Sequence, residues 1–148
     1  MKIDTILVPT DFSEDARRAL EIATNLAGTF GSQVVLLHAY NVDLPFTSPA
    51  FGVTVVLPED FYVEYRNHAM LQIERLAEEV AAKGVDVTGL AVERTAWLAI
   101  LDQAETLPAD LIVMGTRGLT GIKHVAFGST AERVVRRAGC PVLTVKAD

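Results

Sequence analysis

The chain has 148 residues, 50% of them hydrophobic, and a formal net charge of -6 at pH 7. This size suits one domain with a buried core, expected to span residues 1–148. The acidic balance argues against a broad basic surface for nucleic acid, and no apolar run approaches the roughly 20 residues of a membrane-spanning helix. We therefore expect a cytoplasmic protein whose partners include neither nucleic acid nor membrane.

Strand and helix patterns alternate from the start of the chain. Residues 2–8 form an apolar strand closed by Pro9, and residues 14–30 carry apolar side chains at three- and four-residue spacing, which predicts a helix. Residues 33–40 contain a continuous apolar run, as expected of a strand covered on both faces. The proline-containing segment 41–58 is expected to be a surface excursion, acting as a lid, a partner-binding loop or an ordinary insertion.

The alternation continues in the middle of the chain. A long helix is predicted over residues 59–83, and residues 85–93 then alternate between apolar and polar, as in a half-exposed edge strand. A shorter helix over 96–107 precedes an apolar strand over 109–114. Repeated strand-helix-strand units of this kind predict an α/β fold with a parallel sheet.

The most informative segment is residues 115–129, which run GTRGLTGIKHVAFGS between that strand and a final helix over 130–138. Glycines let a backbone approach an anion closely, and the first amides of a helix attract negative charge. The pattern therefore predicts a phosphate-binding loop. Ser129 and Glu132 also form a capping-box pattern, which explains that serine without a ligand but leaves three glycines in so long a loop unexplained.

The last predicted strand covers residues 141–146, where proline at the first position suits an edge. Right-handed crossovers favour a doubly wound, Rossmann-like sheet of five parallel strands in the order 3-2-1-4-5, with helices on both faces. In that order the first and fourth strands are neighbours, and the loops after them part to form a ligand crevice. Loops 9–13 and 115–129 are thus expected to face each other.

The first of these loops supplies Thr10, Asp11 and Ser13. Asp11 has two open interpretations, since it could accept a hydrogen bond from a ribose or base and help to hold magnesium, or could cap the following helix. In the second loop, Arg117, Lys123 and His124 are candidates for contacts with phosphate or solvent. No histidine and carboxylate pair is placed to act with a nucleophile, so strong catalysis is not expected.

Several segments together resemble the universal stress protein family, specifically its ATP-binding branch: ILVPTDFS, ADLIVMGTRG, the glycine pattern, FGSTAERVV and CPVLTV. The resemblance implies binding of ATP, or of ADP or AMP, with or without magnesium, and a homodimer joined through residues 141–146. Phosphate and ribose would contact the glycine loop, the 9–13 loop would line the adenine and ribose side, and His38 or Ala39 would touch the base. The expected binding residues are Pro9, Thr10, Asp11, His38, Ala39, Met114, Gly115, Arg117, Gly118, Gly128, Ser129 and Thr130.

One departure from the family follows the third strand, where many members place a glycine and this chain has Arg94 and Trp97 nearby. Either side chain could reshape the pocket, although Trp97 is expected to pack at a helix start. Three functions remain open: a regulatory module acting through a nucleotide-dependent dimer, a slow magnesium-dependent ATP hydrolase or phosphotransferase, and an interaction protein that needs no nucleotide. The first is preferred.

Overall fold

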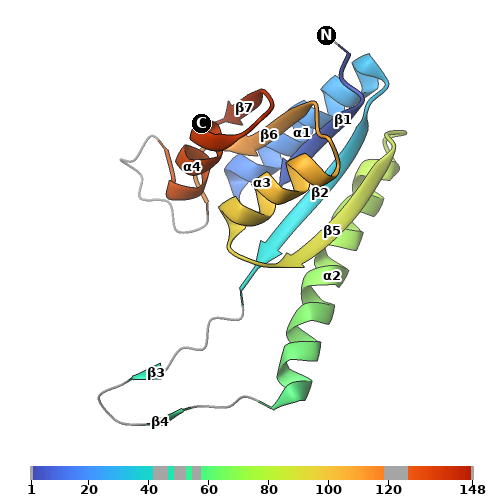
Figure 1. Ribbon diagram of the computed structural model, residues 1–148. Helices are drawn as coiled ribbons and strands as arrows, with labels where there is room; N and C mark the ends of the chain where they lie inside the picture. The colour runs from blue at the N-terminus through green and yellow to red at the C-terminus, as the bar shows by residue number, and fades with distance from the viewer. Residues whose placement is uncertain (1, 42–46, 49–52, 55–57, 119–126, 148) are drawn as a thin grey trace.

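The computed structural model describes residues 2–41, 47–48, 53–54, 58–118 and 127–147. Its main sheet has five strands, all parallel, in the order β5-β2-β1-β6-β7 (Figure 1). This is the predicted order 3-2-1-4-5. The strands are β1 (Thr5–Pro9), β2 (Gln33–Tyr40), β5 (Val87–Glu93), β6 (Leu111–Gly115) and β7 (Val142–Val145).

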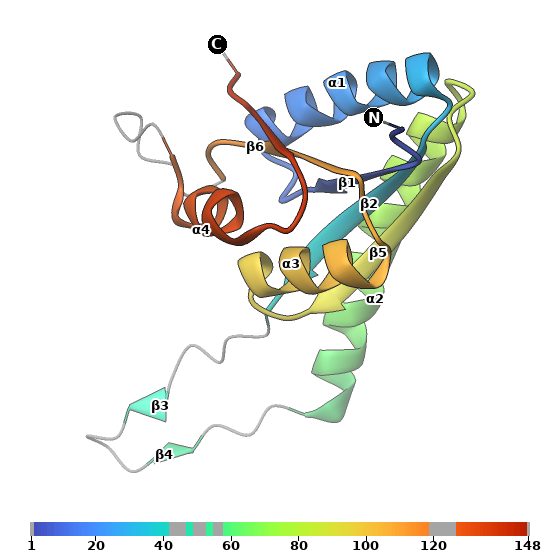
Figure 2. The ribbon, with the colours of Figure 1, turned by 45° about the horizontal axis from the view of Figure 1, so that its top comes forward.

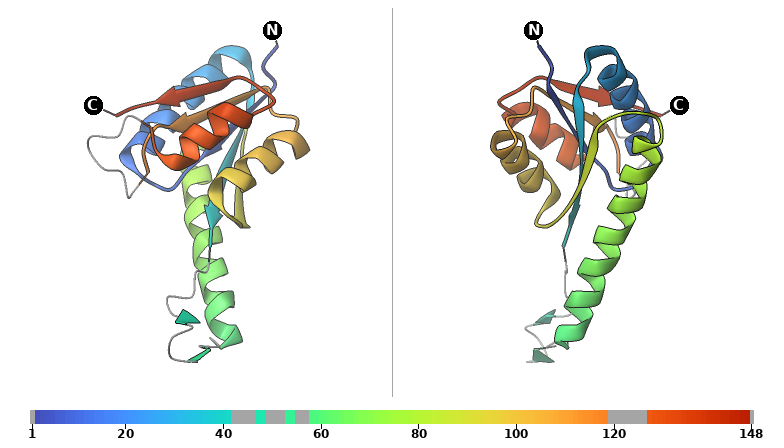
Figure 3. Two further views of the ribbon diagram at one scale, coloured as in Figure 1. Left: turned by 60° about the vertical axis from the view of Figure 1, so that its left-hand side comes forward. Right: turned by 90° about the vertical axis from the view of Figure 1, so that its right-hand side faces the viewer.

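Helices cover both faces of the sheet, as Figure 3 shows with α1 and α2 on one side and α3 and α4 on the other. They span α1 (Glu14–Phe30), α2 (Glu59–Ala81), α3 (Ala96–Thr106) and α4 (Ser129–Arg137). Alternate strand residues face the two layers: Ile6 and Val8 belong to the core beneath α1 and α2, whereas Leu7 belongs to the core beneath α3 and α4. The predicted doubly wound architecture is confirmed.

The ends of α1 follow the local sequence. Ser13 is the N-cap, and its hydroxyl oxygen accepts a hydrogen bond from the amide of Ala16 at 3.3 Å. Gly31 ends the helix in the left-handed conformation, with φ of 70°, which glycine adopts at little cost. These caps fix where the chain leaves β1 and where it enters β2.

The excursion between β2 and α2 lies mostly outside the described residues. Its described part contains two short strands, β3 (Thr47–Ser48) and β4 (Val53–Thr54), paired antiparallel, which the sequence does not predict. The helix that follows, α2, runs well past the end of the sheet (Figure 1). On this helix Phe61 and Tyr65 are exposed, and the Tyr65 ring packs against that of Tyr40 with centroids 5.7 Å apart.

The site lies where the connections after β1 and β6 leave the sheet toward opposite faces. Strands β1 and β6 are hydrogen-bonded neighbours, with Ile6 opposite Leu111 and Leu7 opposite Ile112. After β1 the chain enters α1 on one face of the sheet, and after β6 it enters α4 on the other. The two connections therefore separate at the carboxyl ends of the strands, where open α/β sheets have their crevice.

Candidate functional site

A cavity of about 410 Å³ lies at the carboxyl ends of β1 and β6. It is lined by both loops and by the start of α4, so the two segments expected to face each other do so. All the predicted binding residues except His38 line it: Pro9, Thr10, Asp11, Ala39, Met114, Gly115, Arg117, Gly118, Gly128, Ser129 and Thr130. The sequence did not single out Ala16, Leu37, Ala96, Ile100, Thr116, Phe127 and Ala131, which complete the lining.

His38 is the one predicted binding residue that does not line the cavity, because its side chain lies on the opposite face of the sheet. Its Nδ1 is 3.0 Å from the carbonyl oxygen of Thr10, and its ring lies 4.7 Å from the ring of Phe12. Side chains alternate along a strand, so Leu37 and Ala39 face the cavity while His38 faces α1 and α2. His38 therefore contacts the 9–13 loop from the side of the sheet that faces away from the cavity.

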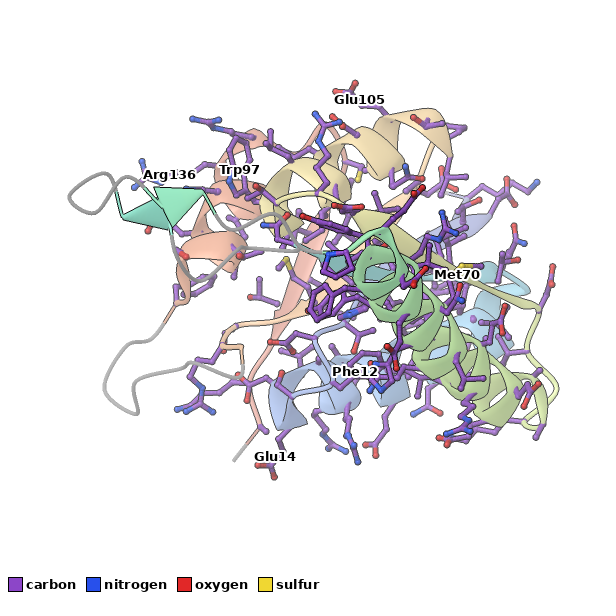
Figure 4. All side chains as sticks on the ribbon, turned by 90° about the horizontal axis from the view of Figure 1, so that it is seen from below. Phe12, Glu14, Met70, Trp97, Glu105 and Arg136 are labelled. Carbon is purple, nitrogen blue, oxygen red and sulfur yellow. The ribbon has the colours of Figure 1, made fainter. Side chains whose placement is uncertain are left out.

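The first loop has a tight internal structure. The amide of Phe12 donates to Thr10 Oγ1 at 3.0 Å, and the amide of Ser13 donates to Asp11 Oδ1 at 3.0 Å. Because Ser13 caps α1, the alternative interpretation of Asp11 as the helix cap is wrong. Phe12 has φ of 64°, a conformation that costs a bulky residue energy and that often marks functional loops. Figure 4 shows Phe12 on the side of α1 and α2.

The two loops meet between Asp11 and Gly118. A Cβ atom on Gly118 would lie 2.5 Å from Asp11 Oδ2, which is closer than real Cβ contacts allow. The absence of a side chain at Gly118 thus leaves room for the carboxylate at the mouth of the loop. The predicted approach of this backbone to a bound phosphate stays a prediction.

The other two glycines bring the backbone together. A Cβ atom on Gly115 would lie 2.8 Å from the Cβ of Asp15 and 3.0 Å from the nitrogen of Ala16, so glycine lets β6 pack tightly on α1. The amide of Gly128 donates to the carbonyl of Thr116 at 2.7 Å, which closes the base of the loop. The loop residues Lys123 and His124, predicted to contact phosphate or solvent, lie outside the described residues.

The start of α4 corrects the capping-box interpretation. Gly128, not Ser129, is the N-cap, and no side chain caps this helix. The carboxylate of Glu132 pairs with Arg136 at 3.1 Å along the same helix instead of reaching back to the cap. Ser129 and Thr130 are the first residues of the helix and line the cavity, together with its positive end. Amides and hydroxyls in this arrangement suit an anionic group.

The charge of Arg117 has a different partner from the predicted one. Its Nε and one terminal nitrogen donate to the two carboxylate oxygens of Asp15 at 3.1 and 3.0 Å. Burial of Asp15 alone would raise the pKa of its carboxyl. Hydrogen bonds from Arg117, Ala147 and Thr116 together outweigh this effect and lower the pKa to about 2. Arg117 thus lines the cavity, and its guanidinium is held by Asp15 and anchors the loop.

The two residues that depart from the family pattern also lie elsewhere. Arg94 pairs with Asp102 at 2.6 Å, and the ring of Trp97 lies beneath the guanidinium groups of Arg133 and Arg137 at 5.5 and 4.9 Å. Figure 4 shows Trp97 on the side of α3 and α4, so it packs at the helix start as expected. The cavity wall near this turn is formed by Ala96 and Ile100.

Two kinds of feature are absent from the described residues. They contain no group of three or more His, Cys, Asp or Glu side chains arranged to hold a metal ion. None of their helices combines the length and apolarity needed to cross a membrane. Among the described residues that line the cavity, Asp11 alone carries a carboxylate.

Comparison with known proteins identifies the family. The universal stress protein family matches residues 2–146. Universal stress protein MJ0531 of Methanocaldococcus jannaschii is 37% identical over 142 residues, which cover 95% of this chain and 81% of that protein. The solved structure of MJ0577 from the same organism has a TM-score of 0.84 and 28% identity, covering 100% of this chain and 99% of that one.

A third comparison concerns a bound ligand. The universal stress protein from Archaeoglobus fulgidus, solved in complex with dAMP, has a TM-score of 0.66 and 24% identity, covering 99% of this chain and 100% of that one. At this identity the similarity establishes the shared fold. The match along residues 2–146 and the relative with 37% identity show the family: this protein belongs to the universal stress protein family.

Proposed function

We propose that residues 1–148 form one cytoplasmic domain that binds ATP, or ADP or AMP, in the cavity between β1 and β6, and acts as a regulatory module through a nucleotide-dependent homodimer. The observation that carries this proposal is the convergence of two loops and an uncapped helix start on one cavity. Each element supplies a different part of a nucleotide site. Family membership supports the same assignment.

The phosphate groups would lie at the glycine loop and the start of α4. Gly118 carries no side chain at the mouth of the loop, where the Asp11 carboxylate lies beside it, and no side chain occupies the cap position of α4. Backbone amides there carry partial positive charge, and the hydroxyls of Ser129 and Thr130 can donate to phosphate oxygens. This binding mode needs no arginine, which agrees with the engagement of Arg117 by Asp15.

The base and ribose would occupy the other end of the cavity. Leu37, Ala39 and Ile100 form an apolar wall against which a planar base can pack. Thr10 and Asp11 offer oxygen atoms to the ribose, and the Asp11 carboxylate is also a suitable oxygen ligand for magnesium next to phosphate. The Archaeoglobus protein of the same fold binds an adenine nucleotide, dAMP, which is consistent with this choice of ligand.

The dimer would form through residues 141–146. β7 is the last strand at one end of the sheet and pairs with β6 alone among the described strands. Its Leu143 is 38% exposed, and Val135 on the adjacent α4 is 47% exposed. An edge strand with apolar side chains is stabilised by a second copy that covers it. Because α4 begins at the cavity and packs beside β7, a ligand and a partner chain would act on neighbouring elements.

Calorimetric titration with ATP, ADP and AMP, each with and without magnesium, tests the proposal. We expect submillimolar binding of at least one nucleotide and roughly a tenfold loss in Ser129→Ala, because one hydrogen bond to a charged group contributes about 1.5–3 kcal/mol. Thr29→Ala is the matched control: it removes a hydroxyl on α1 that donates to the carbonyl of Asn25 in the same helix at 2.9 Å. If none of the three nucleotides binds, the proposal fails, and a nucleotide-independent interaction protein is the function that remains.

A further inference from the structure

A buried carboxylate outside the expected ligand set connects the cavity to the end of the chain. Asp15, in the first turn of α1, is 4% exposed. Its oxygens accept hydrogen bonds from residues far away in the sequence, at separations of 101, 102 and 132 residues. Three segments of the fold, namely α1, the loop after β6 and the tail after β7, therefore meet at one side chain.

The contacts to the loop involve residues that line the cavity. Asp15 Oδ2 accepts from the hydroxyl of Thr116 and from the amide of Arg117, each at 3.0 Å. The guanidinium of Arg117 adds two more hydrogen bonds to the same carboxylate. Both the backbone and the side chains at the start of the loop are thus fixed by Asp15.

The contacts to the tail involve the residue that follows β7 closely. The amide of Ala147 donates to Asp15 Oδ1 at 3.0 Å, and the guanidinium of Arg117 also donates to the carbonyl of Ala147 at 3.2 Å. Ala147 is itself buried, although it is the second-last residue of the chain. Figure 2 shows the tail passing the N-terminal part of α1 on its way to the C-terminus.

A second set of hydrogen bonds runs parallel to the first. The amide of Thr116 donates to the carbonyl of Val145 at 2.8 Å, and the carbonyl of Thr116 accepts from Gly128 at 2.7 Å. The loop start, the N-cap of α4 and the end of β7 thus form one hydrogen-bonded unit. Its charged members are Asp15 and Arg117, whose side chains are 5% and 23% exposed.

We propose that Asp15 is a positioning residue that couples occupation of the cavity to the order of the C-terminal edge, residues 142–147. The inference rests on the proposed function and adds its route of regulation. A ligand that orders the backbone of Thr116 and Arg117 favours the arrangement in which Asp15 also holds Ala147. Coupling between two sites is reciprocal, so a partner chain on β7 strengthens ligand binding to the same extent.

Hydrogen exchange of the full chain, with and without saturating ATP, tests the coupling. The exchange is measured at a protein concentration at which sedimentation shows the same oligomeric state with and without ATP, so that it reports order within the chain. We expect ATP to slow exchange in the peptide covering 142–147 by about fivefold or more, the lower end of typical coupling. In Asp15→Asn, ATP should still bind to the loop but slow this exchange by less than about twofold.

Two matched variants make the result specific. Glu14→Gln removes the same charge from the same helix turn at an exposed position, and should retain the effect of ATP on 142–147. Ala147→Pro removes the tail's N–H donor to Asp15 and fixes the backbone φ angle there, without changing a residue of the cavity, and should lose the effect of ATP. This variant decides the question if Asp15→Asn does not fold.

The outcomes separate the two proposals. Suppose that ATP binds to the unchanged protein. If ATP then fails to slow exchange at 142–147 in that protein, or slows it as much in Asp15→Asn or Ala147→Pro as in the unchanged protein, the coupling role of Asp15 is overturned and nucleotide binding stands. If the unchanged protein binds no nucleotide, the proposed function fails and this inference fails with it. Loss of the effect in both variants, with retention in Glu14→Gln, supports it.

Discussion

The carboxylate of Asp11 occupies the space that a side chain at Gly118 would fill, with only 2.5 Å between Asp11 Oδ2 and the position of a Cβ atom on that glycine. This relationship joins the two loops that line the cavity. One loop supplies the charge and the other supplies the space for it. Replacing the glycine therefore tests the geometry of the site without removing any functional group.

Gly118→Ala should lower the affinity for ATP by about tenfold or more, because the added methyl group displaces the Asp11 carboxylate from the cavity and a tenfold change is only about 1.4 kcal/mol. Calorimetry measures the affinity. Gly28→Ala is the matched control, since a Cβ at this helical position meets nothing within 4 Å. Equal ATP affinity in both variants would contradict the predicted contact between the loops.

Gly115→Ala should reduce stability by about 1–3 kcal/mol, the usual range for overpacking a core. Its Cβ would meet backbone as well as side-chain atoms of Asp15, at 2.9 and 2.8 Å, and backbone cannot rotate away. Urea unfolding of this variant beside Gly28→Ala measures the difference. A loss below about 0.5 kcal/mol, the usual range for surface substitutions, would mean that α1 shifts freely from β6.

Acid should remove the stabilisation that Asp15 provides. Its pKa is lowered to about 2 in the folded protein from 3.8, so its contribution is complete above pH 3.8 and disappears as the pH falls toward 2. The shift corresponds to about 2 kcal/mol. Urea unfolding of the unchanged protein and Asp15→Asn between pH 6 and 2 should show a stability difference that shrinks over this interval. A constant difference would contradict the assignment of the shift to Asp15, and Glu14→Gln controls for charge in the first turn.

Leu143→Asp should weaken the proposed dimer by about 1 kcal/mol or more, because it places a charge in an apolar contact between edge strands. Sedimentation velocity over a range of concentrations measures the dissociation constant. Leu71→Asp makes the same change at an apolar residue of α2 that is 46% exposed, far from β7 in the fold. Association that is unaffected by Leu143→Asp, or equally affected by Leu71→Asp, would place the interface elsewhere.

Much of the architecture could be predicted because separate features of the sequence agree. Apolar runs such as the one in residues 33–40 identify buried parallel strands, and the handedness of crossovers then selects the strand order. That order brings together two loops that lie about a hundred residues apart, and the glycine pattern independently indicates ligand binding. All but one of the expected binding residues line the cavity as a result.

The failures have physical causes in particular residues. His38 was misplaced because β2 is buried on both faces, which hides the two-residue period that would separate it from Ala39. Ser129 matched a capping box, but the helix begins one residue earlier than predicted and uses Gly128 as its cap. Asp15 resembled an ordinary acidic residue in a first helical turn, and nothing local in the sequence indicated partners more than 100 residues away.

The position of Trp97 makes the protein its own optical probe. It is the single tryptophan of the chain, and its indole ring lies beneath two guanidinium groups of α4 while its backbone belongs to α3. The emission of an indole responds to nearby charge, so the fluorescence of this one residue reports the contact between the two helices that border the cavity. Ligand titrations followed by the fluorescence of Trp97 therefore need no added label and no substitution.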